Sequence, residues 1–233
     1  LGQLADGFNK TTVRIRRNME ERVQQQKRLN ETEMRMMQAQ LNPHFLYNTL
    51  STIVWLIEGG MTDDAVEMIS SLSIFFRTSL SKGNDIIPLS EEERHTLSYL
   101  EIQQYRYRDI LEFEINIPKE LSGIPVPKLS IQPLAENALY HGIKNRRGKG
   151  KILIEGREEE DALVLTVSDD GQGMTPERLH EVQEAIRIGE RAGFGLAAVA
   201  ERIALYYGPG YGMKIFSEEG KGTTVEIRLG KNI

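Results

Sequence analysis

The sequence predicts an α+β fold, in which a helical N-terminal part precedes a sheet that carries helices on one face. Residues 1–40 are polar, rich in Glu, Gln, Arg and Met and free of proline, a composition that favours helix. Residues 44–57 and 62–80 have helical hydrophobic periodicity on either side of a Gly-Gly turn. From residue 111 onward, short β-rich runs alternate with helical segments, which indicates an α/β sandwich.

The composition excludes several classes of protein. Hydrophobic residues make up 39% of the 233 residues and charged residues 27%, which is typical of a globular chain with a core. The net charge of −5 argues against nucleic acid as the main partner, because nucleic-acid-binding proteins concentrate positive charge. There is no cysteine, so disulfides, thiol catalysis and cysteine metal sites are excluded. No apolar run approaches the roughly 20 residues that cross a bilayer. The chain begins with Leu1, and we expect it to be a fragment of a longer protein.

The N-terminal helix has too few apolar residues to be buried well on its own. A two-chain coiled coil would stabilise it, and a solvated helix fits the pattern equally well, so both remain open. The two helices that follow are expected to form an antiparallel hairpin, with Thr62 as the N-cap of the second. A third helix is expected to begin after Ser90, with Glu93 completing a capping box.

His44 lies at the start of the first hairpin helix, in the stretch PHFLYN (residues 43–48). A helix advances about 100° per residue, which puts one apolar stripe on the side opposite His44. This stripe comprises Leu46, Leu50, Ile53 and Ile57. Asn48 falls within about 40° of His44. We therefore expect an exposed histidine with Asn48 one turn away, while Pro43 either begins this helix or kinks a longer one.

The second half is expected to contain five strands and three helices. The strands are residues 113–117, 151–156, 162–169, 213–218 and 223–229, and the helices are residues 129–143, 176–188 and 195–207. Thr175 precedes Pro176 and is expected to cap the helix of a lid that follows Gly173. The lid is either mobile or an ordinary surface helix.

Two motifs in this half contain side chains that suit a nucleotide. In residues 129–142, Asn137 and His141 are four apart and share a helix face, with Glu136 on its flank. An amide oxygen suits magnesium, a hard cation that also takes substrate phosphates as ligands. Asp169 ends a strand in the stretch VSDDGQG, where its carboxylate can accept a hydrogen bond from an adenine amino group. The glycines at 171 and 173 allow the backbone to approach a ligand closely.

Two further motifs supply backbone groups. Gly193 and Gly195 open a helix whose N-terminal amides suit phosphate. Residues 220–224 form a glycine turn that leads into a strand. Any one of the four motifs is weak, because a lone glycine pair is usually only a turn. All four in this order are a strong signal.

Together the four motifs resemble the ATP-binding fold shared by gyrase, the ninety-kilodalton heat-shock chaperone, MutL and histidine kinases. With PHFLYN, the hairpin and residues 89–109, the resemblance extends over residues 34–229 and is to sensor histidine kinases of the LytS/YesM type. Residues 1–11 are similar to the last helix of a HAMP linker.

The resemblance implies ATP and Mg²⁺ as cofactors, His44 as the phospho-acceptor and Asn137 as the magnesium-linked residue. The other residues expected around the nucleotide are Glu136, His141, Asp169, Gly171, Gly173, Gly193, Gly195, Leu196 and Thr223. It further implies a homodimer in which two hairpins form a four-helix bundle, and a response regulator as partner. Membrane segments would lie upstream of the chain, which would itself lie at the cytoplasmic face of the cell membrane.

Four parts are expected on this basis. Residues 1–33 would be the end of a HAMP-like linker and a signalling coiled coil, and residues 34–80 the dimerisation and phospho-acceptor hairpin. Residues 81–110 would form a connecting helix, and residues 111–233 the ATP-binding catalytic domain.

Two departures from related sequences bear on the reaction. ATP-hydrolysing relatives have a glutamate general base four residues before the magnesium asparagine, whereas this chain has Pro133. We therefore expect the nucleophile to be a side chain, and a neutral imidazole is competent near neutral pH. Phe45 stands where many histidine kinases have an acidic residue, so the group that orients His44 remains open, with Asn48 as a candidate. The alternatives are an ATP-hydrolysing conformational switch and a non-catalytic dimeric scaffold of the same fold.

Other polar residues admit simpler interpretations. His95 and His180 are expected at the solvated surface, and His141 either contacts the nucleotide or ends a helix. The basic residues at 144–151 form either a phosphate contact or, with more weight, a solvated loop. Three tyrosines, Tyr99, Tyr105 and Tyr107, are expected to pack between the hairpin and the nucleotide domain.

Overall fold

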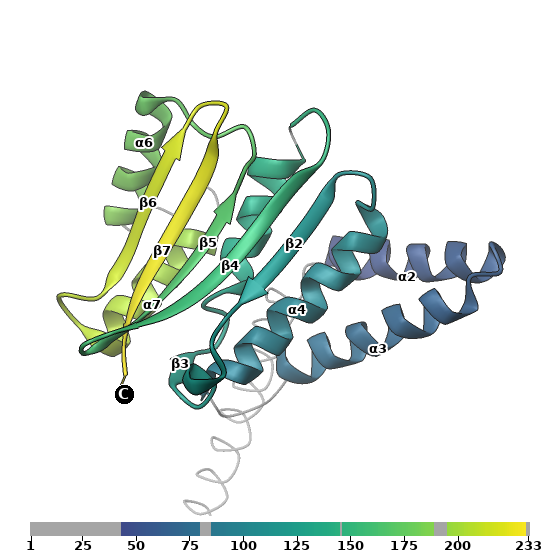
Figure 1. Ribbon diagram of the computed structural model, residues 1–233, viewed down its shortest axis with the longest axis horizontal. Helices are drawn as coiled ribbons and strands as arrows, with labels where there is room; N and C mark the ends of the chain where they lie inside the picture. The colour runs from purple at the N-terminus through teal and green to yellow at the C-terminus, as the bar shows by residue number, and fades with distance from the viewer. Residues whose placement is uncertain (1–42, 80–84, 145, 189–194, 232–233) are drawn as a thin grey trace, which may run out of the picture. The chain divides into compact units, whose positions relative to one another are not determined.

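The computed structural model describes residues 43–79, 85–144, 146–188 and 195–231 (Figure 1). The predictions for residues 1–33, including the HAMP-like end and the coiled coil, lie outside these residues, as does Gly193. Among the helices of the described ranges, none combines the length and the apolar character needed to cross a membrane.

The first part of the described chain is helical. It contains α2 (Pro43–Glu58), α3 (Thr62–Ser79) and α4 (Leu89–Arg106). The α2–α3 turn is closed by hydrogen bonds such as that from the Met61 N–H to the Leu56 carbonyl, at 2.8 Å. Helices α3 and α4 pack along each other, and the Tyr105 hydroxyl of α4 donates to Glu67 of α3 at 2.9 Å. Tyr99 is buried, as expected for packing residues.

A five-stranded sheet forms the second part. Its strands are β2 (Leu111–Asn116), β4 (Gly150–Glu159), β5 (Ala162–Asp169), β7 (Gly222–Gly230) and β6 (Gly212–Glu218), in that spatial order. Only the β2–β4 pair is parallel. The five predicted strands are thus confirmed. A small second sheet, in which β1 (Ile86–Pro88) pairs with β3 (Pro125–Pro127), was not predicted. Each of its strands has only three residues and contains proline, so neither shows a strand pattern in the sequence.

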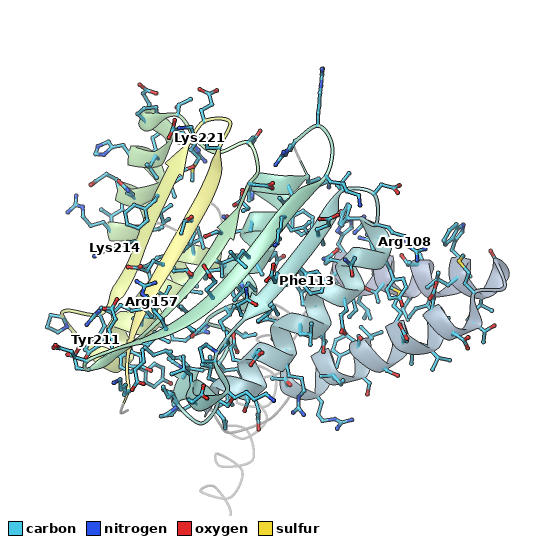
Figure 2. All side chains as sticks on the ribbon, viewed as in Figure 1. Arg108, Phe113, Arg157, Tyr211, Lys214 and Lys221 are labelled. Atoms are coloured by element: carbon cyan, nitrogen blue, oxygen red, sulfur yellow. The ribbon has the colours of Figure 1, made fainter. Side chains whose placement is uncertain are left out.

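Helices cover one face of this sheet (Figure 1). They are α5 (Gln132–Asn137), the π-helical turn η2 (Ala138–Ile143), α6 (Pro176–Arg187) and α7 (Gly195–Tyr207), and a short 3-10 turn, η1 (Lys119–Leu121), follows β2. Alternate residues of β4 and β7, such as Ile152, Ile154 and Ile227, are buried beneath the helices. The opposite face is polar and carries Arg157 of β4 (Figure 2). Arg157 pairs there with Glu226 of β7 at 2.8 Å.

Two helix starts test the capping predictions. Thr175 caps α6 as predicted, since its side chain accepts a hydrogen bond from the Arg178 N–H. The prediction that Ser90 caps α4 is wrong. The helix begins at Leu89 directly after β1, and the Ser90 N–H donates to the Ser122 carbonyl at 3.0 Å. Carbonyl groups of the segment before β3 therefore accept the N–H groups that a capping side chain would otherwise serve.

The residues predicted to form the buried apolar stripe of α2 agree only in part with the residues that are buried in the structure. The buried residues of this helix are Phe45, Thr49, Ile53 and Leu56. Leu50 and Ile57 were predicted to be buried, yet they are 47% and 56% exposed. The helix carries two apolar faces, and periodicity alone does not say which one its own chain covers. His44 is exposed, as predicted.

The prediction that His95 lies at the surface is wrong. Its side chain is completely buried on α4, where it stacks on Phe75 of α3 with ring centroids 4.6 Å apart. Its Nε2 shares a hydrogen bond with the Ser79 hydroxyl at 2.9 Å. Burial lowers the pKa of His95 to about 4, helped by the charge on Lys128, so the ring is neutral at pH 7. His180 is exposed, as predicted.

Candidate nucleotide site

A pocket of about 330 Å³ lies where the helical layer meets the ends of β5 and β7. Its walls come from α5 and η2, from the loop after β5, from the first two turns of α6, from the first turn of α7, and from the turn between β6 and β7. The lining residues are Asn137, His141, Gly142, Asp169, Gln172, Gly173, Met174, Thr175, Arg178, Val182, Leu196, Glu219 and Thr223.

Asp169 is the buried acidic group of this pocket. Its side chain is 8% exposed, and its Oδ1 accepts the Gly171 N–H at 2.9 Å. Burial raises the pKa of Asp169 to about 6, although the backbone N–H groups of Gly171 and Thr223 favour the ionised form. The carboxylate is therefore mostly charged at neutral pH and can accept a hydrogen bond from a ligand N–H.

Glycines bring three loops into close contact around Asp169. A Cβ at Gly142 would overlap the Asp169 carboxyl, and one at Gly171 would overlap the Gly142 backbone. Gly173 and Gly222 have φ angles of 65° and 108°, and a Cβ on either would overlap the backbone of the neighbouring loop. Only glycine fits these positions, so the floor of the pocket is built from backbone.

Gln172 ties the same loops together with hydrogen bonds. Its Nε2 donates to the His141 carbonyl at 3.1 Å, and its N–H donates to the Gly142 carbonyl at 3.3 Å. Its own carbonyl accepts the Gly220 N–H at 2.7 Å. One sign of this role is visible in the sequence, where Gln172 stands between the two glycines of VSDDGQG.

Asn137 and His141 reach the pocket from a helix that changes its pitch. The predicted helix over residues 129–143 begins later, at Gln132, and after Asn137 it widens into η2. Such π-helical turns often occur at functional sites. Partial burial and the nearby charge of Arg178 lower the pKa of His141, which favours a neutral ring at pH 7.

The structure brings together many of the predicted nucleotide contacts. Asn137, His141, Asp169, Gly173, Leu196 and Thr223 all line the pocket. Its lining does not include Gly171, which holds Asp169, nor Gly195, which packs beside Pro133. Glu136 is also absent from the lining, and it accepts a hydrogen bond from the Gln132 side chain at 3.0 Å.

Some lining residues were not among the predicted contacts, although Gly142 and Gln172 lie within two of the predicted motifs. The lining residues outside the predicted contacts are Gly142, Gln172, Met174, Thr175, Arg178, Val182 and Glu219.

The basic residues after η2 do not line the pocket. Arg146 pairs with Asp170 at 2.8 Å, and Lys149 pairs with Glu112 at 3.0 Å. Both pairs are partly exposed, so they fit the interpretation as a solvated loop.

Comparison with known proteins places this architecture in a class and then in a family. Residues 127–233 match the family model of histidine kinase-, DNA gyrase B- and HSP90-like ATPases, so the fold and the pocket define an ATP-binding domain. Residues 32–111 match the histidine kinase family model. The chain belongs to the sensor histidine kinases, as the sequence motifs predict, and the predicted fold class is confirmed.

Three curated relatives are similar along most of the chain. The sensor histidine kinase YesM of Bacillus subtilis is 36% identical over 228 residues, which is 98% of this chain and 38% of YesM. The sensor histidine kinase BtsS of Escherichia coli is 31% identical over 201 residues, covering 86% of this chain and 34% of BtsS. The sensor protein LytS of Bacillus subtilis is 31% identical over 207 residues, covering 88% of this chain and 35% of LytS. The chain thus spans little more than a third of these relatives.

Proposed function

We propose that this chain is the catalytic part of a sensor histidine kinase in a two-component system. It would use ATP to phosphorylate His44 and then pass the phosphoryl group to an aspartate of a response regulator. The observation that carries the proposal is that Asn137, Asp169 and Thr223, from three distant motifs, line one pocket in a chain that matches both kinase family models.

Adenine is the ligand group that fits the Asp169 end of the pocket. An ionised, buried carboxylate is a strong acceptor for an amino group, and its bonds to backbone N–H groups fix its direction. The glycine-lined floor allows a flat ring to approach the backbone. Thr223 lies beside Asp169 in the β5–β7 pairing and adds a hydroxyl.

Asn137 fits a magnesium ion that is held chiefly by the nucleotide. No group of three His, Cys, Asp or Glu side chains that could hold a metal occurs in the described ranges. A cation here would need ligands from elsewhere, and Mg²⁺ commonly takes one or two protein oxygens together with phosphates and waters. The Asn137 amide would supply such an oxygen. Bound there, the ion would neutralise charge on the phosphates during transfer.

His44 is suited to the role of nucleophile because it is exposed in the first turn of α2. A ring nitrogen of the neutral imidazole would attack the γ-phosphorus, the bond to the β–γ bridging oxygen would break, and ADP would leave. Asn48 lies one turn on and is half-buried. We expect Asn48 to orient the ring or a water that attacks the phosphohistidine. Asn48→Ala should then change dephosphorylation more than ATP affinity, and equal loss of both would contradict this role.

A second copy of the chain would cover the exposed apolar seams of the hairpin. On α2 the exposed side chains of Tyr47, Leu50, Val54 and Ile57 repeat with the 3-4-3 spacing of a helix–helix seam. On α3 the exposed Val66 and Ile69 begin the same pattern. A homodimeric four-helix bundle would bury both seams. We further propose that membrane segments precede the chain, that residues 1–33 end a HAMP-like linker with a coiled coil, and that the kinase works at the cytoplasmic face.

The decisive experiment is incubation with γ-labelled ATP and magnesium. The parent should acquire label that is lost in acid and retained in base, as expected for phosphohistidine, and His44→Gln should acquire none. His180→Gln is the matched control, because it makes the same change at an exposed histidine of α6 that does not line the pocket.

Two other outcomes would replace the proposal. Rapid release of phosphate without labelled protein would favour the ATP-hydrolysing switch. Nucleotide binding with neither label nor phosphate release would favour the non-catalytic scaffold. Pro133 at the position of the hydrolytic base argues against the first, and the assembled pocket argues against the second.

A further inference from the structure

The segment that leads into α5 has an unusual backbone. Leu129 has a φ of 61° and is the one non-glycine residue with a positive φ among those that the structure describes. This left-handed conformation costs a leucine about 1–2 kcal/mol. Such a residue persists only where its surroundings hold it, and residues 128–131 are termed the junction segment here.

Glu92 of α4 holds the N–H side of the junction segment. Its side chain is completely buried. One carboxylate oxygen accepts the Leu129 N–H at 2.9 Å, and the other accepts the Ile131 N–H at 2.8 Å. An amide could not serve both donors, because one of its two terminal atoms is itself a donor.

Arg202 of α7 holds the carbonyl side. Its Nη1 donates to the Lys128 carbonyl and lies 3.4 Å from the Leu129 carbonyl. The Lys128 ammonium in turn donates to the carbonyl of Ser79, the last residue of α3, at 2.9 Å. Helices α4 and α7 therefore both bond to the backbone of the junction segment, and the Lys128 side chain links the segment to α3.

The junction segment determines where two walls of the pocket lie. It runs directly into α5, whose last residue, Asn137, lines the pocket. Helix α7 begins beside α5, since a Cβ at Gly195 would lie 3.0 Å from the Pro133 Cβ, and Leu196 lines the same pocket. Neither Glu92 nor Arg202 is among the lining residues.

We propose that Glu92 and Arg202 are positioning residues for phosphoryl transfer, which grip opposite sides of the junction segment so that Asn137 meets magnesium and the phosphates. The adenine end of the pocket stands apart from this grip, because Asp169 and Thr223 belong to paired strands of the sheet. The inference rests on the proposed function. It predicts that changes at the junction segment weaken the magnesium-dependent part of nucleotide affinity and leave the magnesium-free affinity, to which adenine contributes, unchanged.

The test measures ADP affinity by calorimetry, with magnesium and with a chelator. It also measures the maximal rate of His44 labelling and the ATP concentration that gives half of this rate. The variants are Glu92→Gln and Arg202→Met, with Arg202→Lys as the conservative rescue. The controls are Glu93→Gln and Arg94→Met, which make the same charge changes at less buried positions of α4. If Glu92→Gln does not fold, Arg202→Met and Arg202→Lys are sufficient for the test. Magnesium-free ADP binding shows whether the pocket is folded in each variant.

We expect magnesium-free ADP affinity within about twofold of the parent, and a loss of most of the affinity gained with magnesium. The maximal rate of labelling should fall about tenfold or more, which is the size of one lost charged hydrogen bond. Arg202→Lys should recover part of the lost rate. An unchanged magnesium gain in both variants, or equal losses with and without magnesium, would overturn the inference alone. A parent that binds ADP without any magnesium gain would overturn the magnesium assignment of the proposed function and this inference with it.

Discussion

Replacing Asp169 by asparagine should improve stability while weakening nucleotide binding. The carboxyl is 8% exposed, and burial raises its pKa from 3.8 to about 6. Its charge is therefore unfavourable for the folded nucleotide-free protein and favourable for a ligand that donates a hydrogen bond. Asp169→Asn removes the charge and keeps the size of the side chain, so the two effects should have opposite signs.

The size of the stability effect follows from the pKa shift. A carboxyl whose pKa is raised by folding holds its proton longer in the folded state than in the unfolded chain. This group therefore lowers the free energy of unfolding as the pH rises from about 4 to about 6, and the free energy stays at the lower level above about pH 6. A shift of about two units corresponds to about 3 kcal/mol. Asparagine has one acceptor oxygen for the N–H groups of Gly171 and Thr223, which offsets about 1 kcal/mol. We expect a net gain of about 1–2 kcal/mol near pH 7.5.

Urea unfolding of parent and variant at two pH values measures this difference. The gain of Asp169→Asn should be present near pH 7.5 and should shrink near pH 5, where the parent carboxyl is largely protonated. Loss of a charge-assisted hydrogen bond of about 1.5–3 kcal/mol should weaken nucleotide binding about 10- to 150-fold near pH 7.5. A variant less stable than the parent near pH 7.5, or one that binds nucleotide equally well, would refute the reasoning.

Three other changes should have defined outcomes. Gly173→Ala, at a positive φ and against the Glu218 carbonyl, should destabilise the domain by more than about 2 kcal/mol and abolish nucleotide binding, as measured by thermal unfolding and calorimetry. Thr175→Ala removes the cap of α6 and should cost about 1 kcal/mol, visible as faster amide exchange in the first turn of that helix only. Because burial lowers the pKa of His95 from 6.5 to about 4, the contribution of His95 to stability should be fully present above about pH 6.5 and should be lost as the pH falls towards 4. His95→Phe keeps the stacking on Phe75 and should flatten this acid slope, whereas an unchanged slope would show that other groups cause it.

The sheet and its helices could be predicted because their signals are local. The prediction of residues 162–169 coincides with β5, and that of residues 195–207 with α7, since continuous apolar runs and a glycine start mark their ends. Four motifs likewise indicated the pocket, because glycines that allow close backbone contact are visible in the sequence. The roles of Gln172 and Gly142 depend on the mutual approach of loops, which no single motif contains.

Helix faces were harder to predict, because burial depends on partners elsewhere in the chain. His95 stands among polar neighbours in the sequence, yet Phe75 and Ser79 of another helix enclose it. On α2 the apolar residues form two faces, and the exposed Leu50 and Val54 belong to the seam that we assign to a second copy. A single sequence gives the period of such a pattern and leaves its orientation undetermined.

Glu92 shows most clearly what local patterns omit. It stands in the run Glu91-Glu92-Glu93, and such a charge run normally indicates a solvated face. One member of the run is nevertheless fully buried, at a desolvation cost that only good hydrogen bonds can offset. Its partners are the N–H groups of Leu129, which has the left-handed backbone, and of Ile131, 37 and 39 residues away. We therefore expect the buried carboxylate and the strained backbone to stabilise each other, so that a change at either shifts Asn137, although neither Glu92 nor Leu129 lines the pocket.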